Sequence, residues 1–240
     1  MFIKIKSLMR SYVNLPVHPQ WLVLRNQNKL RGEIAQLIEG RTLDIGSGSN
    51  QIARLVSSKT HYVSLDYPAT HAKGYEGIPD IFGDGHHLPF RNESFNSIIL
   101  LDVLEHLPFP EQCLQETARV LCKGGKLILK VPFLYPLHDM PHDFQRWTLP
   151  GLEMLLKREQ FTISDQRFFG NPSETAAALG AIALAKGILD ILEHRLPTII
   201  LIPLLLTAII SINLTGWVLA KILPPNDFMP LGYLLICTKK

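Results

Sequence analysis

Short apolar runs alternate along this chain with segments of helical spacing, and this alternation limits the folds that are open to it. The runs occupy residues 41–46, 61–66, 79–85, 94–103, 125–132 and 161–169. Their apolar residues are largely continuous, which is typical of strands covered on both faces of a parallel sheet. Between the runs, helical periodicity predicts helices at residues 21–40, 50–58, 110–125 and 148–159. The pattern therefore predicts a doubly wound α/β domain.

An acidic residue stands at the end of each of the first four predicted strands. These residues are Asp44, Asp66, Asp84 and Asp102. In a doubly wound sheet, ligands bind beyond the carboxyl ends of the strands, so the four carboxylates are candidates for one binding site. Taken singly, each could also be an ordinary turn residue, for example in an Asx-turn at Asp84.

The first of these strand ends does not match a dinucleotide-binding fingerprint. That fingerprint reads G-x-G-x-x-G, whereas the run here is "GSGSNQ", with Gln51 in place of the third glycine. The carboxylate of Asp44 would repel a pyrophosphate, but it would attract a cation. Asp66 could accept hydrogen bonds from both hydroxyl groups of a ribose in any adenosine site. A nicotinamide-dependent oxidoreductase is therefore the less favoured interpretation.

Four ordered stretches together resemble a known family. They are "TLDIGSGSN", "YVSLDY", "FGDGHHLPFRNESFNSIILLDVLEHL" and "ARVLCKGGKLILKVPF". In this combination and spacing, from about Arg41 to Trp147, the chain resembles the class I S-adenosylmethionine (SAM)-dependent methyltransferases, and most of all their type 11 branch. The resemblance implies a Rossmann-like sheet of seven mostly parallel strands, with SAM as the cofactor.

The resemblance also implies a set of cofactor-binding residues: Asp44, Gly46, Ser47, Gly48, Asp66, Tyr67, Asp84, Gly85, His86, Asp102 and Val103. Within this set, Asp44 would lie near the ammonium group of SAM, Asp66 would bind the ribose, and Asp84 would meet the adenine amino group. An acidic rim suits a ligand that is cationic at its sulfur and amino groups. The chain departs from the family pattern between Asp66 and Pro79, where a short segment with a proline and two glycines predicts a loop.

The string "YPLHDMPHDFQRWT" at 135–148 is the candidate acceptor side. Similar strings occur in members of the type 11 branch, and His142 or Asp143 is the candidate general base. Arg146 could bind an acidic acceptor, or it could pair with Asp143 and tie the loop to the domain. His106 is a second candidate base, although such a histidine often orients the helix that follows it. The prolines at 136 and 141 disfavour a helix that would align the His-Asp pairs, so no metal site is predicted.

A long apolar insertion precedes the last predicted strand. Residues 196–220 carry no charge and are long enough for a helix to span a bilayer, and residues 175–192 form a weaker apolar stretch. The segment 231–240 is read as a seventh, antiparallel strand, so the insertion must return to the side it left. The insertion at 173–224 is therefore predicted to be a membrane-attached helical hairpin. The alternatives are a soluble dimer interface or a covered core.

These features divide the chain into an N-terminal helical segment (1–40), a methyltransferase-like domain (41–172 with 225–240) and the insertion. The net charge of +3, with no clustered Lys or Arg run, gives no indication of a nucleic-acid partner. The three cysteines are odd in number and far apart, as expected in a reduced compartment such as the cytoplasm.

Together, the sequence predicts a SAM-dependent methyltransferase on the cytoplasmic side of a membrane. Its acceptor would be a small molecule, a glycan or a lipid-linked compound. The alternatives are a non-catalytic membrane-associated SAM-binding module, a soluble cytoplasmic enzyme and, less favoured, the oxidoreductase.

Overall fold

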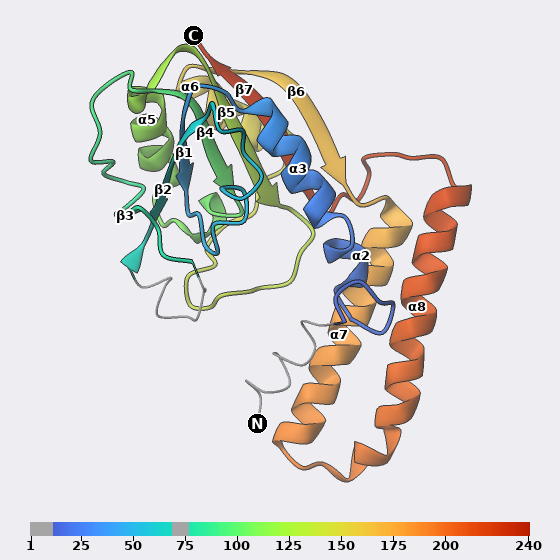
Figure 1. Ribbon diagram of the computed structural model, residues 1–240. Helices are drawn as coiled ribbons and strands as arrows, with labels where there is room; N and C mark the ends of the chain where they lie inside the picture. Colours follow the sequence, from blue (N-terminus) through green and yellow to red (C-terminus); the bar gives the residue numbers. More distant parts are fainter. Residues whose placement is uncertain (1–11, 69–76) are drawn as a thin grey trace. The chain divides into compact units, whose positions relative to one another are not determined.

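The computed structural model describes residues 12–68 and 77–240 (Figure 1). The first 11 residues of the predicted N-terminal segment and most of the loop predicted after Asp66 lie outside these ranges. The chain divides into two compact units. The sheet unit comprises residues 29–133, 137–168 and 232–240, and the helical unit comprises the described residues of 1–28 with 134–136 and 169–231.

The sheet unit is built on seven strands. They are β1 (Arg41–Ile45), β2 (His61–Asp66), β3 (Ile81–Phe82), β4 (Phe95–Leu101), β5 (Leu121–Pro132), β6 (Phe161–Phe169) and β7 (Gly232–Lys239). The strand order is β3-β2-β1-β4-β5-β7-β6. The pairs from β3 to β5 are parallel, and β7 is antiparallel to β5. The predicted doubly wound sheet with an antiparallel seventh strand is therefore confirmed.

The core of this unit lies on both faces of the central strands. Ile98, Ile99 and Leu100 of β4 are fully buried, and so are Leu127 and Leu129 of β5. Successive residues of a strand point to opposite faces, so burial of three in a row requires cover on both sides. This explains the continuous apolar runs of the sequence.

Three helices of the unit are α3 (Gln27–Leu37), α5 (Pro110–Val120) and α6 (Leu149–Arg158). Pro110 begins α5, where its missing N–H costs nothing. The Thr148 side chain accepts a hydrogen bond from the Gly151 N–H at 3.3 Å, which makes Thr148 the N-cap of α6.

The prediction of a helix at 50–58 is wrong. That segment is a series of turns, in which the N–H groups of Asn50 and Leu55 each bond to the carbonyl three residues earlier. The predicted helix at 21–40 is two helices, α2 (Trp21–Leu24) and α3. The helix predicted to reach the double glycine ends at Val120, because Leu121 is already extended and pairs with Phe95.

The helical unit contains α2, α7 (Pro172–Glu193), the short 3-10 helix η2 (Pro197–Leu201) and α8 (Ile202–Ile222). A capping box starts α7, in which the Asn171 side chain accepts from the Ser173 N–H at 2.9 Å and the Glu174 carboxylate accepts from the Asn171 N–H. Helices α7 and α8 form the hairpin predicted for the insertion (Figure 1). Both are long and apolar enough to cross a membrane, by length and composition alone.

Candidate functional site

The glycine loop after β1 approaches β2 and β4 closely. Gly46 and Gly48 have φ angles of +74° and +54°, which glycine adopts without a steric cost. A Cβ on Gly46 would lie 2.3 Å from Cγ2 of Val103, so a larger residue does not fit there. The Gly48 N–H donates to Asp66 Oδ2 at 2.8 Å. The contacts of the glycine loop therefore bring the ends of β1, β2 and β4 together, as predicted.

Asp66 is buried and held in place by the backbone. Its Oδ1 accepts from the Tyr67 N–H at 2.7 Å, and its Oδ2 accepts from Gly48. Each carboxylate oxygen has two acceptor sites, so one on each oxygen is left for a ligand hydroxyl. The carboxylate can therefore receive the two hydroxyls of a ribose.

Asp44 is a buried acid at the end of the central strand β1. The Tyr62 hydroxyl donates to its Oδ2. Burial raises the pKa of Asp44, the hydrogen bond from Tyr62 lowers it and the charge of Asp66 adds to the rise, which together bring the pKa to about 7. A ligand cation beside Asp44 would favour the ionised carboxylate. The hydroxyl oxygen of the neighbouring Ser47 is also buried, with no hydrogen-bond partner among the residues that the structure describes.

The third strand end is an Asx-turn, the alternative that the sequence left open. Asp84 Oδ1 accepts from the His86 N–H at 2.9 Å and lies 2.7 Å from His86 Nδ1. Burial raises the pKa of Asp84, but the hydrogen bonds from His86 outweigh it and hold the pKa below its usual value. Gly85 packs against Ile45 and Cys113. The turn thus presents Asp84 as an anion with His86 beside it.

At the fourth strand end, Asp102 has a φ of +54° and pairs with Lys130 of β5. Its neighbour Val103 is the residue against which Gly46 packs. Arg31 of α3 also lies close enough for the charge of Asp102 to act on it, although burial lowers the pKa of Arg31 overall. The cofactor-binding candidates Asp102 and Val103 therefore border the glycine loop.

Directly after β4, the short 3-10 helix η1 (Leu104–His106) carries Glu105 and His106. The loop after β5 brings His138 to them. His106 Nε2 and His138 Nε2 each lie 3.8 Å from Glu105 Oε1, and the two rings are 4.8 Å apart between centroids. Burial raises the pKa of Glu105 to about 8, and the charge of Asp102 adds to this. We call Glu105, His106 and His138 the Glu-His cluster.

Asp143 is paired with Arg146. Both guanidinium Nη atoms donate to its carboxylate, Nη2 at 2.8 Å, and the His138 N–H donates to Oδ2 at 2.9 Å. The hydrogen bonds from Arg146 hold the pKa of Asp143 at about 2. Such a carboxylate is a weak base, so the geometry favours the alternative in which this pair ties the loop. His142 is exposed, and its carbonyl oxygen lies 2.7 Å from His106 Nδ1.

Residues 43–129 match the family model described as "Methyltransferase domain". A probable tRNA methyltransferase 9B of Homo sapiens is 34% identical over 37% of this chain and 20% of that protein. The demethylmenaquinone methyltransferase of Thermotoga maritima is 28% identical over 50% of this chain and 54% of that protein. The chain thus spans about half, or less, of the length of the curated relatives it matches.

A crystal structure described as a SAM-dependent methyltransferase, possible histamine N-methyltransferase, from Thermotoga maritima has the same fold. It superimposes with a TM-score of 0.55 at 16% identity, over 96% of this chain and 94% of that chain. By sequence over residues 43–129 and by fold, the chain is similar to class I methyltransferases. The sequence resemblance and the implied fold are therefore confirmed.

The cofactor of class I methyltransferase domains is SAM, and the residues of this domain fit it. The glycine loop leaves no room for a Cβ at Gly46, Asp44 is buried at the end of the strand before it, and the hydroxyl oxygen of Ser47 in the loop is buried without a partner among the described residues. Asp66 retains acceptor sites for two hydroxyls. An amino acid joined to a nucleoside has matching groups: an ammonium, a ribose diol and an adenine.

Sequence reasoning about the methyltransferase domain missed Glu105 and Tyr62. Glu105 could have been noticed as a charge within the strongly apolar stretch "LLDVLEHL". Tyr62 lies on the neighbouring strand β2, two residues before Ser64, which is the register partner of Asp44. Nothing in the local sequence indicates this contact. His138 was part of the candidate loop but was not singled out.

Proposed function

We propose that this chain is a SAM-dependent methyltransferase that is attached to the cytoplasmic face of a membrane and methylates a lipid or lipid-linked acceptor. The proposal has two parts, the transfer reaction and the membrane. Each depends on a different unit of the molecule and has its own test.

One observation carries the transfer reaction. Three buried or turn-held carboxylates, Asp44, Asp66 and Asp84, follow three adjacent strands beside a loop that only glycine can form. A purely structural domain gains nothing from a buried acid such as Asp44, whose raised pKa opposes folding at neutral pH. A cationic ligand with a ribose explains all three.

SAM supplies a methyl group on a positively charged sulfur. The role of the chain is then to hold the two reactants in line and to accept a proton from an acceptor that carries one. In this proposal the Glu-His cluster faces the acceptor, and Nε2 of His106 or His138 takes the proton. Asp143 and Arg146 act as positioning residues, because they anchor the loop that carries His138.

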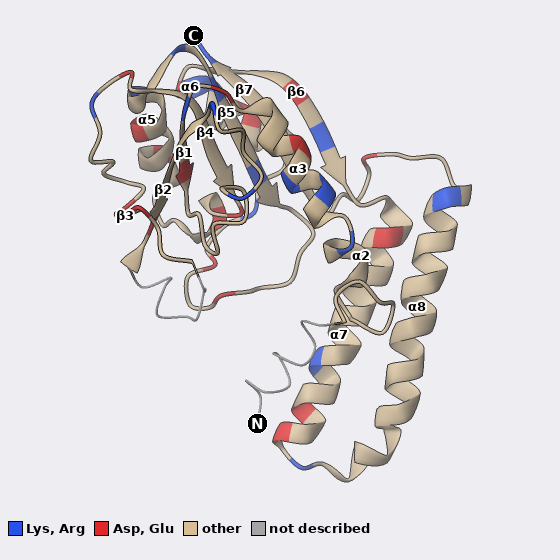
Figure 2. Ribbon diagram, viewed as in Figure 1, with Lys and Arg blue, Asp and Glu red and all other residues tan. Residues whose placement is uncertain are grey.

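The hairpin supports the membrane part of the proposal. Helix α8 has 21 residues and α7 has 22, which at about 1.5 Å per residue matches a bilayer core of about 30 Å. Lys221, in the last turn of α8, is the charged residue of that helix, and Figure 2 shows α8 in tan over most of its length with blue near one end. Lys221 lies 3.5 Å from the centroid of the Trp217 ring, a pair suited to a membrane interface.

The connections of the hairpin also restrict its path. It leaves from β6 and returns to β7, which are neighbours in one sheet. The two ends of the hairpin must therefore lie on the same side of a membrane. A domain held at a bilayer meets lipidic acceptors at high local concentration. One relative is a demethylmenaquinone methyltransferase, and demethylmenaquinone is such a lipidic compound.

Calorimetric titration of the detergent-purified chain with SAM tests the transfer part. We expect the Asp66→Ala variant to bind SAM about 30-fold more weakly, through the loss of roughly 2 kcal/mol of hydrogen bonding to a charged acceptor. Asp165→Ala, on the exposed part of β6, is the matched control and should bind normally. Tighter binding of NAD than of SAM would contradict the proposal.

Turnover then separates an enzyme from a binding module. Purified chain is incubated with radiolabelled SAM and total membrane lipid extract, and the label is followed into the organic phase. SAM binding without any labelled product, across lipid, glycan and small-molecule extracts, would favour the non-catalytic module.

Flotation with liposomes tests the membrane part. The intact chain should float with the vesicles at high salt, and a chain with Leu204 and Leu214 changed to Lys should remain in the soluble fraction. A stable soluble dimer that does not float would favour the dimer-interface alternative.

A further inference from the structure

Glu105 is a buried carboxylate whose charge is not met by a hydrogen bond. Its side chain is fully buried, and neither oxygen has a hydrogen-bond partner among residues 12–68 and 77–240. The nearby cations Lys130 and Arg146 each pair with another acid, Asp102 and Asp143. An ionised carboxylate in this position is costly unless a further positive charge joins it.

Two imidazole nitrogens point at the same oxygen of Glu105. His106 Nε2 and His138 Nε2 both lie 3.8 Å from Oε1, which is too long for a hydrogen bond. The two rings are inclined at 75° to one another, so they converge on the carboxylate from different directions. The three ligand atoms all lie within 4.8 Å of one another.

The other nitrogen of each ring is oriented by a protein acceptor. His106 Nδ1 lies 2.7 Å from the His142 carbonyl oxygen, which can only accept, so Nδ1 carries the proton. His138 Nδ1 lies 3.2 Å from Asp143 Oδ2, closer than its 3.5 Å contact with Arg146. His106 is thus held as the tautomer in which the Nε2 lone pair faces Glu105, and a metal ion would select the same tautomer of His138, whose Nδ1 could then donate to Asp143. Ligating histidines are usually oriented in this way.

We propose that Glu105, His106 and His138 bind one divalent transition-metal ion of the zinc type. Two imidazole nitrogens and one carboxylate oxygen form a ligand set that zinc accepts, with a fourth position left open. At metal–ligand distances of about 2.0 to 2.2 Å, tetrahedral ligand atoms lie about 3.4 Å apart, so the 3.8 Å pairs need to close by about 0.4 Å. This site was not expected from the sequence, because it depends on Glu105 rather than on the His-Asp pairs.

The ion would stand where the acceptor is expected, at the end of β4. Its open position could take an acceptor oxygen or a water molecule and lower its pKa. That use rests on the proposed function, whereas the binding site itself rests on the geometry of the cluster. The ion would occupy both Nε2 lone pairs and would replace the imidazoles as the group that activates the acceptor.

The test is zinc titration of the full chain, purified in detergent and stripped with a chelator. We expect one Zn²⁺ per chain in competition with a chromophoric chelator. Glu105→Gln and His138→Ala should each weaken binding by at least tenfold, and Asp143→Asn, which weakens the loop anchor and the contact with His138 but removes no ligand, should weaken it less. His61→Ala is the matched control, since His61 is exposed at the opposite end of β2.

Cobalt substitution gives a readout that is independent of activity. Bound Co²⁺ should show the visible bands of a four-coordinate ion in the wild type, and Glu105→Gln should lose them. Melting curves and SAM binding show that each variant is folded. The proposal is overturned if the wild type binds no stoichiometric Zn²⁺, or if folded Glu105→Gln and His138→Ala bind it unchanged. Asp66→Ala should lose SAM and keep zinc, which separates failure of this site from failure of the cofactor site.

Discussion

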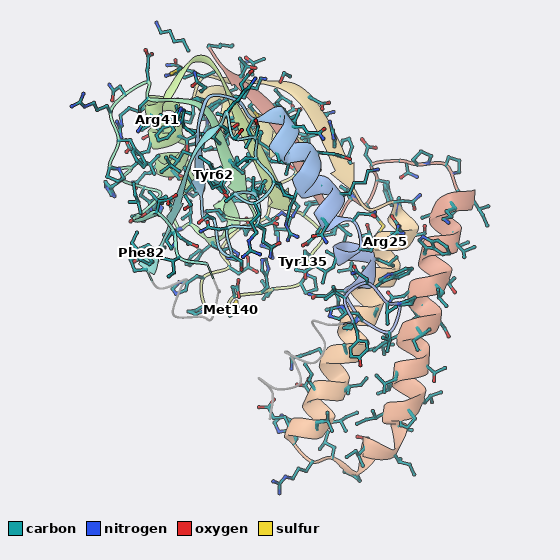
Figure 3. All side chains as sticks on the ribbon, viewed as in Figure 1. Arg25, Arg41, Tyr62, Phe82, Tyr135 and Met140 are labelled. Atoms are coloured by element: carbon teal, nitrogen blue, oxygen red, sulfur yellow. The ribbon has the colours of Figure 1, made fainter. Side chains whose placement is uncertain are left out.

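The two units of this protein differ in how far their large apolar side chains are exposed. In the sheet unit the large residues are inside: Leu100 and Leu127 are fully buried. In the helical unit Ala178 and Ala181 are buried beside a few large residues such as Ile209, while many large residues are exposed, as in Ile200 (82%) and Leu204 (66%). Figure 3 shows side chains projecting outward along both α7 and α8. Both units are rich in apolar residues, so composition alone does not explain the difference.

The difference indicates two different surroundings. In water, folding gains free energy by hiding large apolar side chains. In a bilayer, helices gain by packing closely through small residues, while large apolar side chains can face the lipid. The sheet unit follows the first pattern, and the α7–α8 pair follows the second. The comparison therefore supports the membrane proposal without reference to hydropathy.

The largest expected effect is a matched pair of leucine truncations. Leu100→Ala should lower the free energy of unfolding of the sheet unit by about 2 to 5 kcal/mol, because it leaves a cavity in a fully buried strand. Leu204→Ala should change stability by less than about 0.5 kcal/mol, because the side chain has few protein contacts to lose. Thermal melting in detergent measures both. Similar losses at the two positions would break the comparison.

Asp44→Asn should have the next largest effect and acts on the functional end of the sheet. An unfolded aspartate ionises near pH 4, whereas folded Asp44 keeps its proton to about pH 7. The contribution of Asp44 to the free energy of unfolding of the wild type should therefore fall between about pH 4 and 7 and then level off. The upper limit of this loss is about 4 kcal/mol, at about 1.4 kcal/mol per pKa unit. We expect the variant to be about 2 kcal/mol more stable at pH 8, since the amide also loses hydration.

The same variant should bind SAM more weakly. A ligand ammonium favours ionised Asp44, so wild-type affinity should fall as the pH drops below about 7, and the variant should lack this dependence. Melting curves and titrations at pH 5 to 8 measure both effects. If Asp44→Asn were destabilised at pH 8 while SAM affinity kept its wild-type pH dependence, Asp44 would be a structural residue. Asp165→Asn on β6 serves as the control.

The strand ends could be predicted from the sequence, because a buried strand has a continuous apolar run and its end is marked by an acid or a glycine. Asp44, Asp66 and Asp84 were found in this way. The turns at 50–58 could not be predicted, since their apolar residues have helical spacing but their N–H groups bond three residues back. The Glu-His cluster depends on where the loop returns His138, 33 residues after Glu105. No local pattern encodes that return.

The smallest expected effect tests close packing within the hairpin, using two glycines in helices. A Cβ on Gly216 of α8 would lie 2.3 Å from the Ala177 Cβ, whereas one on Gly187 of α7 would meet nothing within 4 Å. Alanine gains about 1 kcal/mol over glycine in a helix interior. Gly187→Ala should therefore stabilise the unit by up to about 1 kcal/mol. Gly216→Ala should destabilise it by about 1 kcal/mol, because the added methyl group pushes α7 and α8 apart and the lost packing outweighs the gain in helix propensity. Melting of the two variants in lipid nanodiscs measures the contrast, and equal stabilisation of both would mean that α7 and α8 do not pack closely at Gly216.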